Sequence, residues 1–342
     1  MGTANQAKIQ YEAGRTKTAY EKMTDSGDRT TLTPSAQVLS GKEGYAPTVR
    51  PNGIVTGQNL VKPAASGEND KVDVAAFTAN SAGTLFTVAA DTDVAITRPA
   101  GALAKVNSVT MNSSGAVAVV VGTDGASATF SEVRAAAGGP PLIPADSVEI
   151  AQIRVASSAG ATIALSEVFQ VIGQHSEMAN FPTYQLDNIG QGLSATASAQ
   201  TTAHLKFDSA LPLSHTGPAT KGVYIEYYEP VFADLPRSAE FVPADTSHSN
   251  SQQNFYGGTV TSTTESLTQG SFQVLLDNGV NDGILLEANS TCTVKFYPDK
   301  NRSPFILMQG KLGVQRTFPT SGGQIQANCT VSSEKAAASF NG

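Results

Sequence analysis

Apolar and polar residues alternate with a period of two through much of the last part of the chain. Between positions 324 and 331 the odd residues are apolar and the even residues are polar. Such alternation predicts a β-strand with one buried face and one exposed face. The exposed face of this strand would carry Gln324, Gln326, Asn328 and Thr330.

Two further stretches, 291–296 and 311–318, alternate in the same way. Turn-forming sequences such as Asp277-Asn278-Gly279 separate the alternating stretches, and these residue types readily adopt the positive φ angles of tight turns. We therefore predict an antiparallel sheet. Its polar face holds amides, hydroxyls and glycines with few charges, so we interpret it as a surface that lines something.

Residues 71 to 172 form a separate block rich in Ala, Val, Ser and Thr. Short strands at fairly even spacing are expected here, which is typical of an immunoglobulin-like β-sandwich, although the Cys-Trp-Cys pattern is absent. The expected strands are 72–77, 85–88, 94–97, 106–111, 116–121, 148–155 and 162–165. We divide the chain into an N-terminal strand with an extended arm (1–62), an inserted sandwich (63–173) and a main β domain (174–342).

The segment 23–57 is irregular and contains several prolines and glycines. A connection of this length without periodicity is unusual inside a compact domain. Its apolar content exceeds that of a typical linker, which favours an arm ordered by a neighbouring subunit over a disordered segment. The residues expected to make this contact are Val38, Leu39, Tyr45, Val49, Arg50 and Ile54.

Two further segments are predicted to lie outside the sheets. Residues 243 to 254 are rich in Ser, Asn and Gln and are predicted to form a polar loop. Residues 334 to 342 contain a run of alanines and are predicted to form a short tail with weak helical tendency.

The composition is poor in charge. Charged residues make up 15% of the chain, against about 25% in an average globular protein, and there is no Trp. Such a surface repels copies of itself weakly, which suits a subunit covered by its neighbours, while a loop-rich soluble β protein is the simpler alternative. The net charge of −7 and the lack of Lys and Arg clusters argue against a nucleic-acid-binding module.

No stretch of the chain has the pattern of a signal peptide or of a transmembrane helix, which needs about 18 consecutive apolar residues. We therefore expect synthesis in the cytoplasm and no insertion into a membrane. Cys292 and Cys329 both fall on the apolar side of predicted strands, so we expect small buried side chains rather than a disulfide. Two cysteines and four scattered histidines do not suggest a zinc site.

A search for short catalytic and nucleotide-binding motifs finds none of the phosphate-binding, dinucleotide-binding, zinc-protease or nucleophile-elbow patterns. The trio Asp245, Ser247 and His248 is the nearest approach to a catalytic group. Consecutive loop residues rarely point at one another as a triad does, so a solvated loop is favoured. For Asp91 and Asp93 a turn with solvated carboxylates is favoured over a calcium site.

Other candidate ligands have equally simple explanations. Hairpin turns account for Asp277 and Asp282 better than a calcium loop does. His175, His204 and His215 are isolated in sequence, and each is predicted to be a surface or cap residue rather than a metal ligand. We therefore predict no catalytic residues, no cofactor and no metal site, and we do not expect an enzyme; a β-scaffold hydrolase is the alternative that an activity screen would detect.

Several short motifs resemble the major tail tube proteins of long-tailed bacteriophages. The resemblance covers about residues 8 to 60 and 180 to 333, and the inserted block looks like the immunoglobulin-type insertions of some tail proteins. The motifs are Gly270-Ser271-Phe272, Leu276-Asp277-Asn278-Gly279-Val280, Lys295-Phe296-Tyr297-Pro298-Asp299, Gln309-Gly310, Leu312-Gly313-Val314, Tyr45-Ala46-Pro47 and Arg50-Pro51-Asn52-Gly53.

The resemblance implies a tail-tube-type β-barrel or sandwich with six copies per ring, and rings stacked into a hollow tube of the virion tail. It implies as partners other copies of the chain, the tape measure protein, the tail terminator and tail tip proteins, and DNA in passage. Gln324, Gln326, Asn328 and Thr330 would then face the lumen, and the arm would join successive rings. A phage adhesin or baseplate module that binds a host surface glycan through the sandwich is the alternative.

Overall fold

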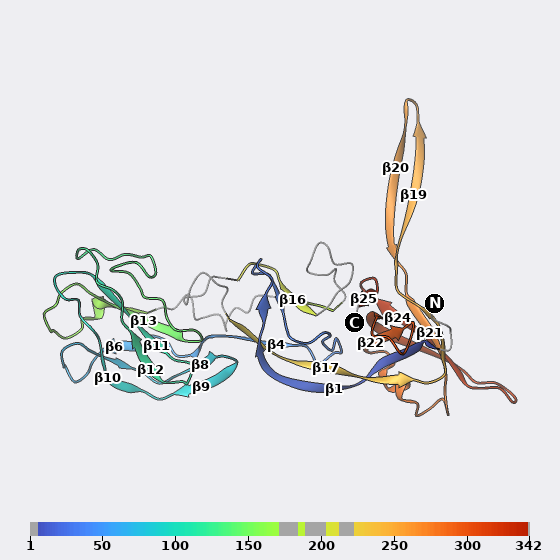
Figure 1. The fold of residues 1–342 in the computed structure, drawn as a ribbon, viewed down its shortest axis with the longest axis horizontal. Coiled ribbons are helices and arrows are strands. Elements are labelled where there is room, and N and C mark those ends of the chain that lie inside the picture. The colour runs from blue at the N-terminus through green and yellow to red at the C-terminus, as the bar shows by residue number, and fades with distance from the viewer. Residues whose placement is uncertain (1–5, 171–183, 189–202, 212–221, 341–342) are drawn as a thin grey trace.

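The computed structural model describes residues 6–170, 184–188, 203–211 and 222–340. The protein is mainly β, with 52% strand and 3% helix, and its strands pair in antiparallel fashion, as the alternating pattern predicts. The molecule is elongated, with a β-sandwich at one end, the C-terminal sheet at the other, and the long strands β1 and β17 running between them (Figure 1).

One large sheet organises the body of the protein. Its strands follow one another in the order β18-β21-β24-β23-β22-β1-β17-β4, and β25 pairs with β23 beside this path. Their bounds are β1 (Lys8–Lys22), β4 (Thr48–Pro51), β17 (Val223–Leu235), β18 (Ser238–Val242), β21 (Gly270–Leu275), β22 (Thr291–Tyr297), β23 (Phe305–Thr317), β24 (Gln326–Ser333) and β25 (Ala338–Phe340).

The C-terminal part of this sheet surrounds a core of its own. Apolar residues of β1, β21, β22, β23 and β24 form one buried cluster, to which the short 3-10 helix η3 (Gly283–Glu287) adds Ile284. Strand β17 leads through the turn at Arg237 into β18, which pairs with β21 at the other margin of the sheet. The sheet is therefore curled around its own apolar side chains.

A second cluster lies where β1 and β17 leave the C-terminal sheet. It joins Met23, just after β1, and Ile225 of β17 to residues of a small sheet with the order β15-β16-β3-β2. The strands of this sheet are β2 (Thr24–Asp25), β3 (Thr31–Thr33), β15 (Tyr184–Asp187) and β16 (His204–Phe207).

Residues 53 to 170 form the sandwich. Three small sheets, β12-β11-β13-β14, β10-β7-β6 and β5-β8-β9, share one buried apolar cluster. The elements are β5 (Gly53–Thr56), β6 (Val61–Pro63), β7 (Lys71–Val74), β8 (Phe77–Ser81), β9 (Thr84–Val88), β10 (Asp91–Ala95), β11 (Lys105–Met111), β12 (Val117–Val120), β13 (Val148–Val155), the 3-10 helix η2 (Leu165–Glu167) and β14 (Val168–Gln170).

The sandwich begins earlier than the predicted boundary at residue 63. Strand β5 pairs with β8, and Leu60 and Val61 are buried in the sandwich cluster. The sequence of residues 53–63 does not indicate that they belong to the sandwich, because strands of three or four residues are too short to show a period of two. The second predicted boundary, around residues 173–182, lies outside the described residues.

Two predicted irregular segments are strands. Residues 243–254, predicted as a loop, enter β19 (Thr246–Phe255), which pairs with β20 (Gly258–Leu267). The C-terminal residues, predicted as a tail, form β25, and Phe340 is buried in a stack on Phe305 with 4.8 Å between the ring centroids. A long-range aromatic contact therefore overrides the weak local helical tendency. Within the described ranges no helix has the length and apolar character needed to cross a membrane.

Candidate functional site

The polar side of the C-terminal sheet is the first candidate surface. From Gln326 to Ser332 the residues of β24 alternate between exposed and fully buried: Gln326, Asn328 and Thr330 are exposed, and the residues between them are buried. Gln324, just before the strand, is exposed as well. The predicted alternation is confirmed for a single chain, whereas a position facing a lumen stays a prediction.

The neighbouring strands extend this polar surface. Asn328 lies between Gln273 of β21 and Gln315 of β23, and residues directly opposite each other on paired strands share a face. Gly313 lies opposite Thr330, whose Oγ1 would be 2.6 Å from a Cβ at Gly313. We call this surface the polar face; it consists of Ser271, Gln273, Gly313, Gln315, Gln324, Gln326, Asn328 and Thr330.

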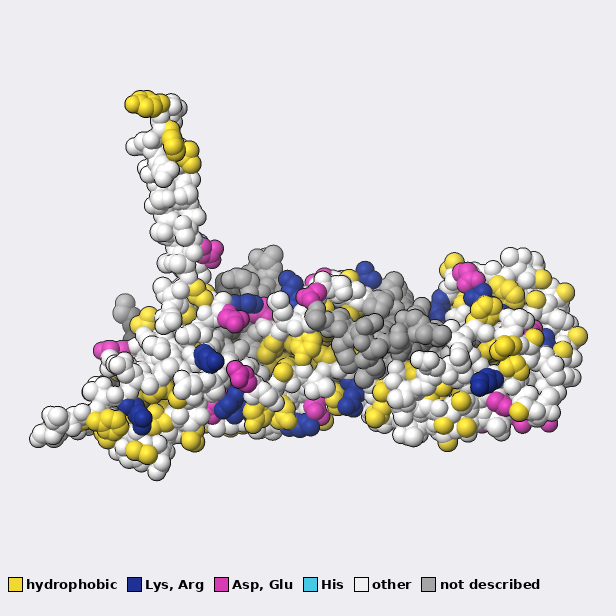
Figure 2. Space-filling view, turned by 180° about the vertical axis from the view of Figure 1, so that it is seen from behind, with side chains coloured by type: hydrophobic (Ala, Val, Ile, Leu, Met, Phe, Trp, Pro, Cys, Tyr) yellow, Lys and Arg dark blue, Asp and Glu magenta, His cyan; other side chains and the backbone are white. Residues whose placement is uncertain are grey.

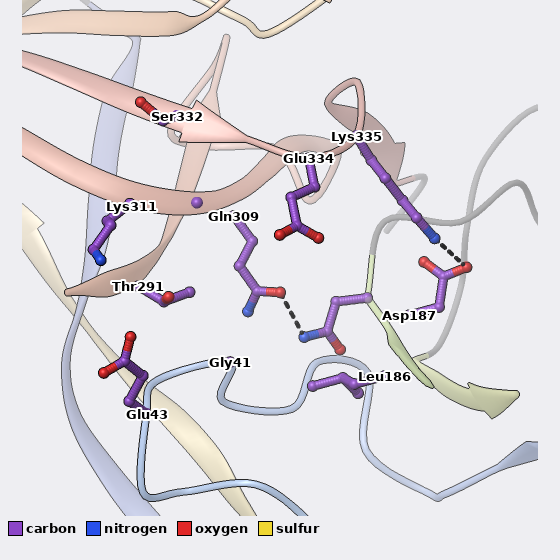
Figure 3. A pocket seen from close by; sticks show the side chains of 12 residues that line it. Gly41, Glu43, Leu186, Asp187, Thr291, Gln309, Lys311, Ser332, Glu334 and Lys335 are labelled. Carbon is purple, nitrogen blue, oxygen red and sulfur yellow. Dashed lines mark hydrogen bonds and ion pairs between the residues drawn. The ribbon is translucent and has the colours of Figure 1, made fainter. Parts of the chain in front are cut away.

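A polar pocket of about 420 Å³ is lined in part by Lys311 and Ser332 (Figure 3). This pair follows Gly313 and Thr330 along β23 and β24, so the pocket lies at one end of the polar face. Asn188 Nδ2 donates to Gln309 Oε1 at 3.2 Å, and the Nζ atom of Lys335 lies 2.9 Å from the Asp187 carboxylate. The residues around it are Gly41, Glu43, Leu186, Asp187, Asn188, Thr291, Gln309, Gly310, Lys311, Ser332, Glu334 and Lys335. The pocket therefore brings together β15, β22, β23, the end of β24 and the segment around Gly41.

Ion pairing holds one wall of the pocket together. Burial opposes ionisation of Asp187, but hydrogen bonds from His204 and Lys335 outweigh it and keep the pKa of this carboxyl below its ordinary value. His204 is buried, with Nε2 3.1 Å from Asp187. The prediction of a surface or cap role for His204 is therefore wrong, because the carboxylate of Asp187, directly opposite on β15, compensates its burial. His175 and His215 lie outside the described residues.

The hairpin of β19 and β20 is the second candidate surface. Every residue of both strands is exposed, and the hairpin stands away from the rest of the molecule (Figure 1). Phe255 is 60% exposed and Tyr256 fully exposed at its tip, while most of its length carries uncharged polar side chains (Figure 2). Strands with both outer edges unpaired offer a row of free backbone donors and acceptors to another chain.

The sequence analysis missed this hairpin. Its two ten-residue strands carry Ser, Thr, Asn and Gln on both faces, so no apolar alternation marks them. The available signal is local: the pair Gly257-Gly258, with φ of +102° at Gly257, lies between two polar runs, and the second run is rich in Thr. Cross-strand hydroxyl pairs such as Ser251 and Ser262, with Oγ atoms 2.6 Å apart, complete the ladder.

The predicted arm is part of the chain's own fold. Leu39 is fully buried and Val49 is 7% exposed, and both lie in the cluster shared with β17, while Val38 packs against Phe305. Asn188 holds the backbone of Leu39 through two hydrogen bonds, of 3.0 Å to its nitrogen and 2.6 Å to its oxygen. In the single chain Val38, Leu39 and Val49 are therefore already buried, which contradicts the expectation that they wait for a partner.

The remaining arm residues also contact their own chain. Tyr45 packs edge-on against Tyr228 at 5.0 Å, and Arg50 Nη1 donates to the Gly83 carbonyl at 2.9 Å. Ile54 packs against the sandwich cluster. The apolar content of the segment was a valid signal of burial, but sequence alone does not tell burial within one chain from burial between chains.

The catalytic and metal candidates do not converge. Ser247 and His248 are successive residues of β19, so their side chains point to opposite faces, and Ser247 Oγ bonds Ser266 Oγ at 2.8 Å. The Asp282 carboxylate accepts the backbone N–H of Asp277 at 2.6 Å, which confirms the turn. Asp93 bonds Ser66. Among the described residues, no three His, Cys, Asp or Glu side chains are grouped so that they could hold a metal ion.

The two cysteines behave as predicted. Cys292 and Cys329 are free and fully buried, on β22 and β24. Burial raises the pKa of each thiol to about 12, so the reactive thiolate is scarce at neutral pH.

Comparisons with known proteins identify no relative of this chain. A scan against models of protein families finds no match, and a search of curated proteins finds no similar chain. The geometry of the polar face and of the hairpin is therefore the basis for the function proposed next.

Proposed function

We propose that this protein is a structural subunit of a phage tail tube, in which copies of the chain assemble into stacked rings around a water-filled channel. The observation that carries the proposal is the exposed hairpin of β19 and β20. The motifs that resemble major tail tube proteins supply the specific assembly, including six copies per ring.

The hairpin supports self-assembly for a physical reason. A two-stranded hairpin without a covered face is marginally stable in water, and ten residues at about 3.3 Å each give it a reach of about 33 Å. Besides Tyr256 at the tip, its titratable residues are His248 and Glu265, so it meets little repulsion from a second copy. A neighbouring subunit that pairs with its edges or covers a face would stabilise it.

The polar face supports the channel. Its amides and hydroxyls are hydrated but attract phosphates weakly, whereas a wall of Lys and Arg would hold DNA with a Kd of about 10⁻⁴ to 10⁻⁶ M at each contact. Gln324, Gln326, Asn328 and Thr330 are the proposed lumen-facing residues. The tape measure protein during assembly, and DNA during ejection, would pass along them.

The contact between rings is proposed at the hairpin rather than at residues 23–57, because Val38, Leu39 and Val49 of that segment are already buried in their own chain. The tail terminator and tail tip proteins would bind the two ends of the tube. The proposed location is the virion tail, after assembly in the host cytoplasm.

Electron microscopy of the concentrated protein tests the proposal. We expect hollow tubes of uniform diameter from the full chain. A variant in which residues 247–266 are replaced by Asn-Gly, joining Thr246 to Leu267, should remain folded and form no tubes, while Leu286→Ser, which alters an exposed residue of the body, should still form them. Compact single particles from the unaltered chain at every concentration would refute the tube.

A glycan-array measurement distinguishes the tube subunit from the alternative function, a glycan-binding adhesin or baseplate module. Binding of a defined surface glycan by the unaltered protein, combined with the absence of tubes, would favour an adhesin or baseplate module.

A further inference from the structure

The sandwich and the body meet at a compact polar contact that the tube proposal does not use. The chain passes from the body into the sandwich with only Asn52 between β4 and β5. The sandwich contributes the β8–β9 turn at Ala82-Gly83 and the loop at Asp146. The body contributes Asn52 and Tyr224, together with Arg50 and Tyr20. We call this contact the joint; it consists of Tyr20, Arg50, Asn52, Ala82, Gly83, Asp146 and Tyr224.

Asp146 is the centre of the joint. Its Oδ1 atom accepts a hydrogen bond from the Tyr224 hydroxyl at 2.8 Å and another from Asn52 Nδ2 at 3.1 Å. The Asn52 side chain also accepts the backbone N–H of Ala82 at 2.8 Å. A carboxylate of the sandwich is therefore held from two places, by Tyr224 of β17 and by Asn52 at the start of the connection, which restricts rotation as well as separation.

The β8–β9 turn forms the other half of the joint. Arg50 donates to the Gly83 carbonyl at 2.9 Å, and its guanidinium carbon lies 4.1 Å from the centroid of the Tyr20 ring. Gly83 has a φ of +77°, and a Cβ at this position would lie 2.5 Å from the Cβ of Tyr20. The close approach of the turn to the body therefore requires glycine at this position.

Burial favours the joint as well. Tyr224 is 7% exposed, and its pKa is raised by burial and by its bond to Asp146, so its hydroxyl keeps the donor proton at neutral pH. The charged groups at the contact are one guanidinium and one carboxylate, each with hydrogen-bond partners from the opposite side. Separating the two parts would leave these groups without their present partners.

We propose that the joint holds the sandwich in one fixed orientation relative to the body. The sandwich is then a rigid extension of the subunit and not a domain on a flexible linker. This inference does not rest on the tube: it holds for any assembly that contains the chain. In a ring it would place each sandwich at one fixed angle.

Pulsed electron paramagnetic resonance on the full chain tests the joint. Spin labels on Ala13→Cys in β1 and Ala159→Cys in the sandwich occupy exposed positions, and the two native thiols are buried and remain unlabelled. We expect one narrow distance distribution. The double variant Tyr224→Phe with Asn52→Ala removes both hydrogen bonds to the Asp146 side chain and leaves the sequence of the sandwich unchanged.

For each hydrogen bond to the Asp146 carboxylate that is lost, we expect the fraction of molecules with the sandwich detached from the body to rise about tenfold or more. This fraction would broaden the distribution of distances between the two spin labels. The matched control, Tyr297→Phe with Asn301→Ala, changes the same residue types in β22 and in the turn that follows it, far from the joint in sequence, and should leave the distribution narrow. Gly83→Ala should broaden it by steric clash. A broad distribution in the unaltered joint, or a narrow one in the double variant with its circular dichroism preserved, would overturn the proposal.

Discussion

Leu39→Ala tests whether the segment before β4 belongs to the folded subunit. Leu39 is fully buried, and its cluster includes Leu32, Val49 and Ile225. Replacing a buried Leu by Ala removes its transfer free energy and leaves a cavity, which together cost about 2 to 5 kcal/mol. The surrounding strands are paired and cannot collapse freely, so we expect a loss of about 3 kcal/mol in the free energy of unfolding.

Tyrosine fluorescence during urea unfolding is a suitable assay. The chain has no Trp, and its nine tyrosines all lie outside residues 53–170, so the signal reports the body and not the sandwich. Tyr227 belongs to the same buried cluster as Leu39, so its emission is sensitive to the altered region. Leu286→Ala, at a residue that is 78% exposed, is the control and should change stability by less than about 0.5 kcal/mol.

The two variants distinguish the two explanations of the segment. An arm that is free until assembly would make Leu39→Ala as mild as the control. A difference below about 0.5 kcal/mol between them would therefore refute the burial argument. A large loss without assembly partners would establish that the segment is part of the subunit core.

Two further predictions concern buried charge. Glu149 is fully buried and is held by Arg134 and Ser108, so Glu149→Ala should lower the free energy of unfolding of the sandwich by about 3 to 5 kcal/mol in calorimetry. Glu132 is an exposed partner of Arg154, and Glu132→Ala should cost less than about 1 kcal/mol. Equal effects of the two substitutions would contradict the role of burial. Burial lowers the pKa of Lys295 in the folded protein from 10.5 to about 8. Between pH 8 and pH 10.5 the unfolded chain therefore binds more protons than the folded chain, and the free energy of unfolding should rise with pH. Below pH 8 the folded protein bears the full cost of burying the charged amine. Lys295→Met should raise the melting temperature at pH 7 and reduce its rise from pH 8 to 9.5; an unchanged slope would show that Lys295 does not titrate there.

Sequence reasoning succeeded where one face of a strand is buried by its own sheet. The alternation around Ala327 and Cys329 predicted β24 because each apolar side chain points into the adjacent cluster. It was weaker where burial comes from distant segments. Thr293, predicted on a polar face, is fully buried, and Gln309 from β23 donates to its hydroxyl at 2.9 Å.

The candidate surfaces differ in the same way. The polar face could be predicted because its apolar counterpart marks the strand. The hairpin could not, since a ribbon exposed on both faces has no apolar period, and its register depends on backbone pairing and on hydroxyl pairs such as Ser247 with Ser266. The joint depends on Asp146, whose two partners come from positions far away in the sequence.

The pairing of β1 with β17 has a consequence for how the chain matures. Gln10 and Asp234 are paired across 224 residues, so β1 cannot pair with β17 until about that many further residues have been synthesised. At about 5 to 20 residues per second, the delay is about 11 to 45 s. During this time the sandwich, whose contacts are local, can fold on the emerging chain, while Ile9 and Tyr11 stay uncovered. Nascent β1 is therefore the segment for which we expect binding by chaperones, and early misassociation of chains should begin there.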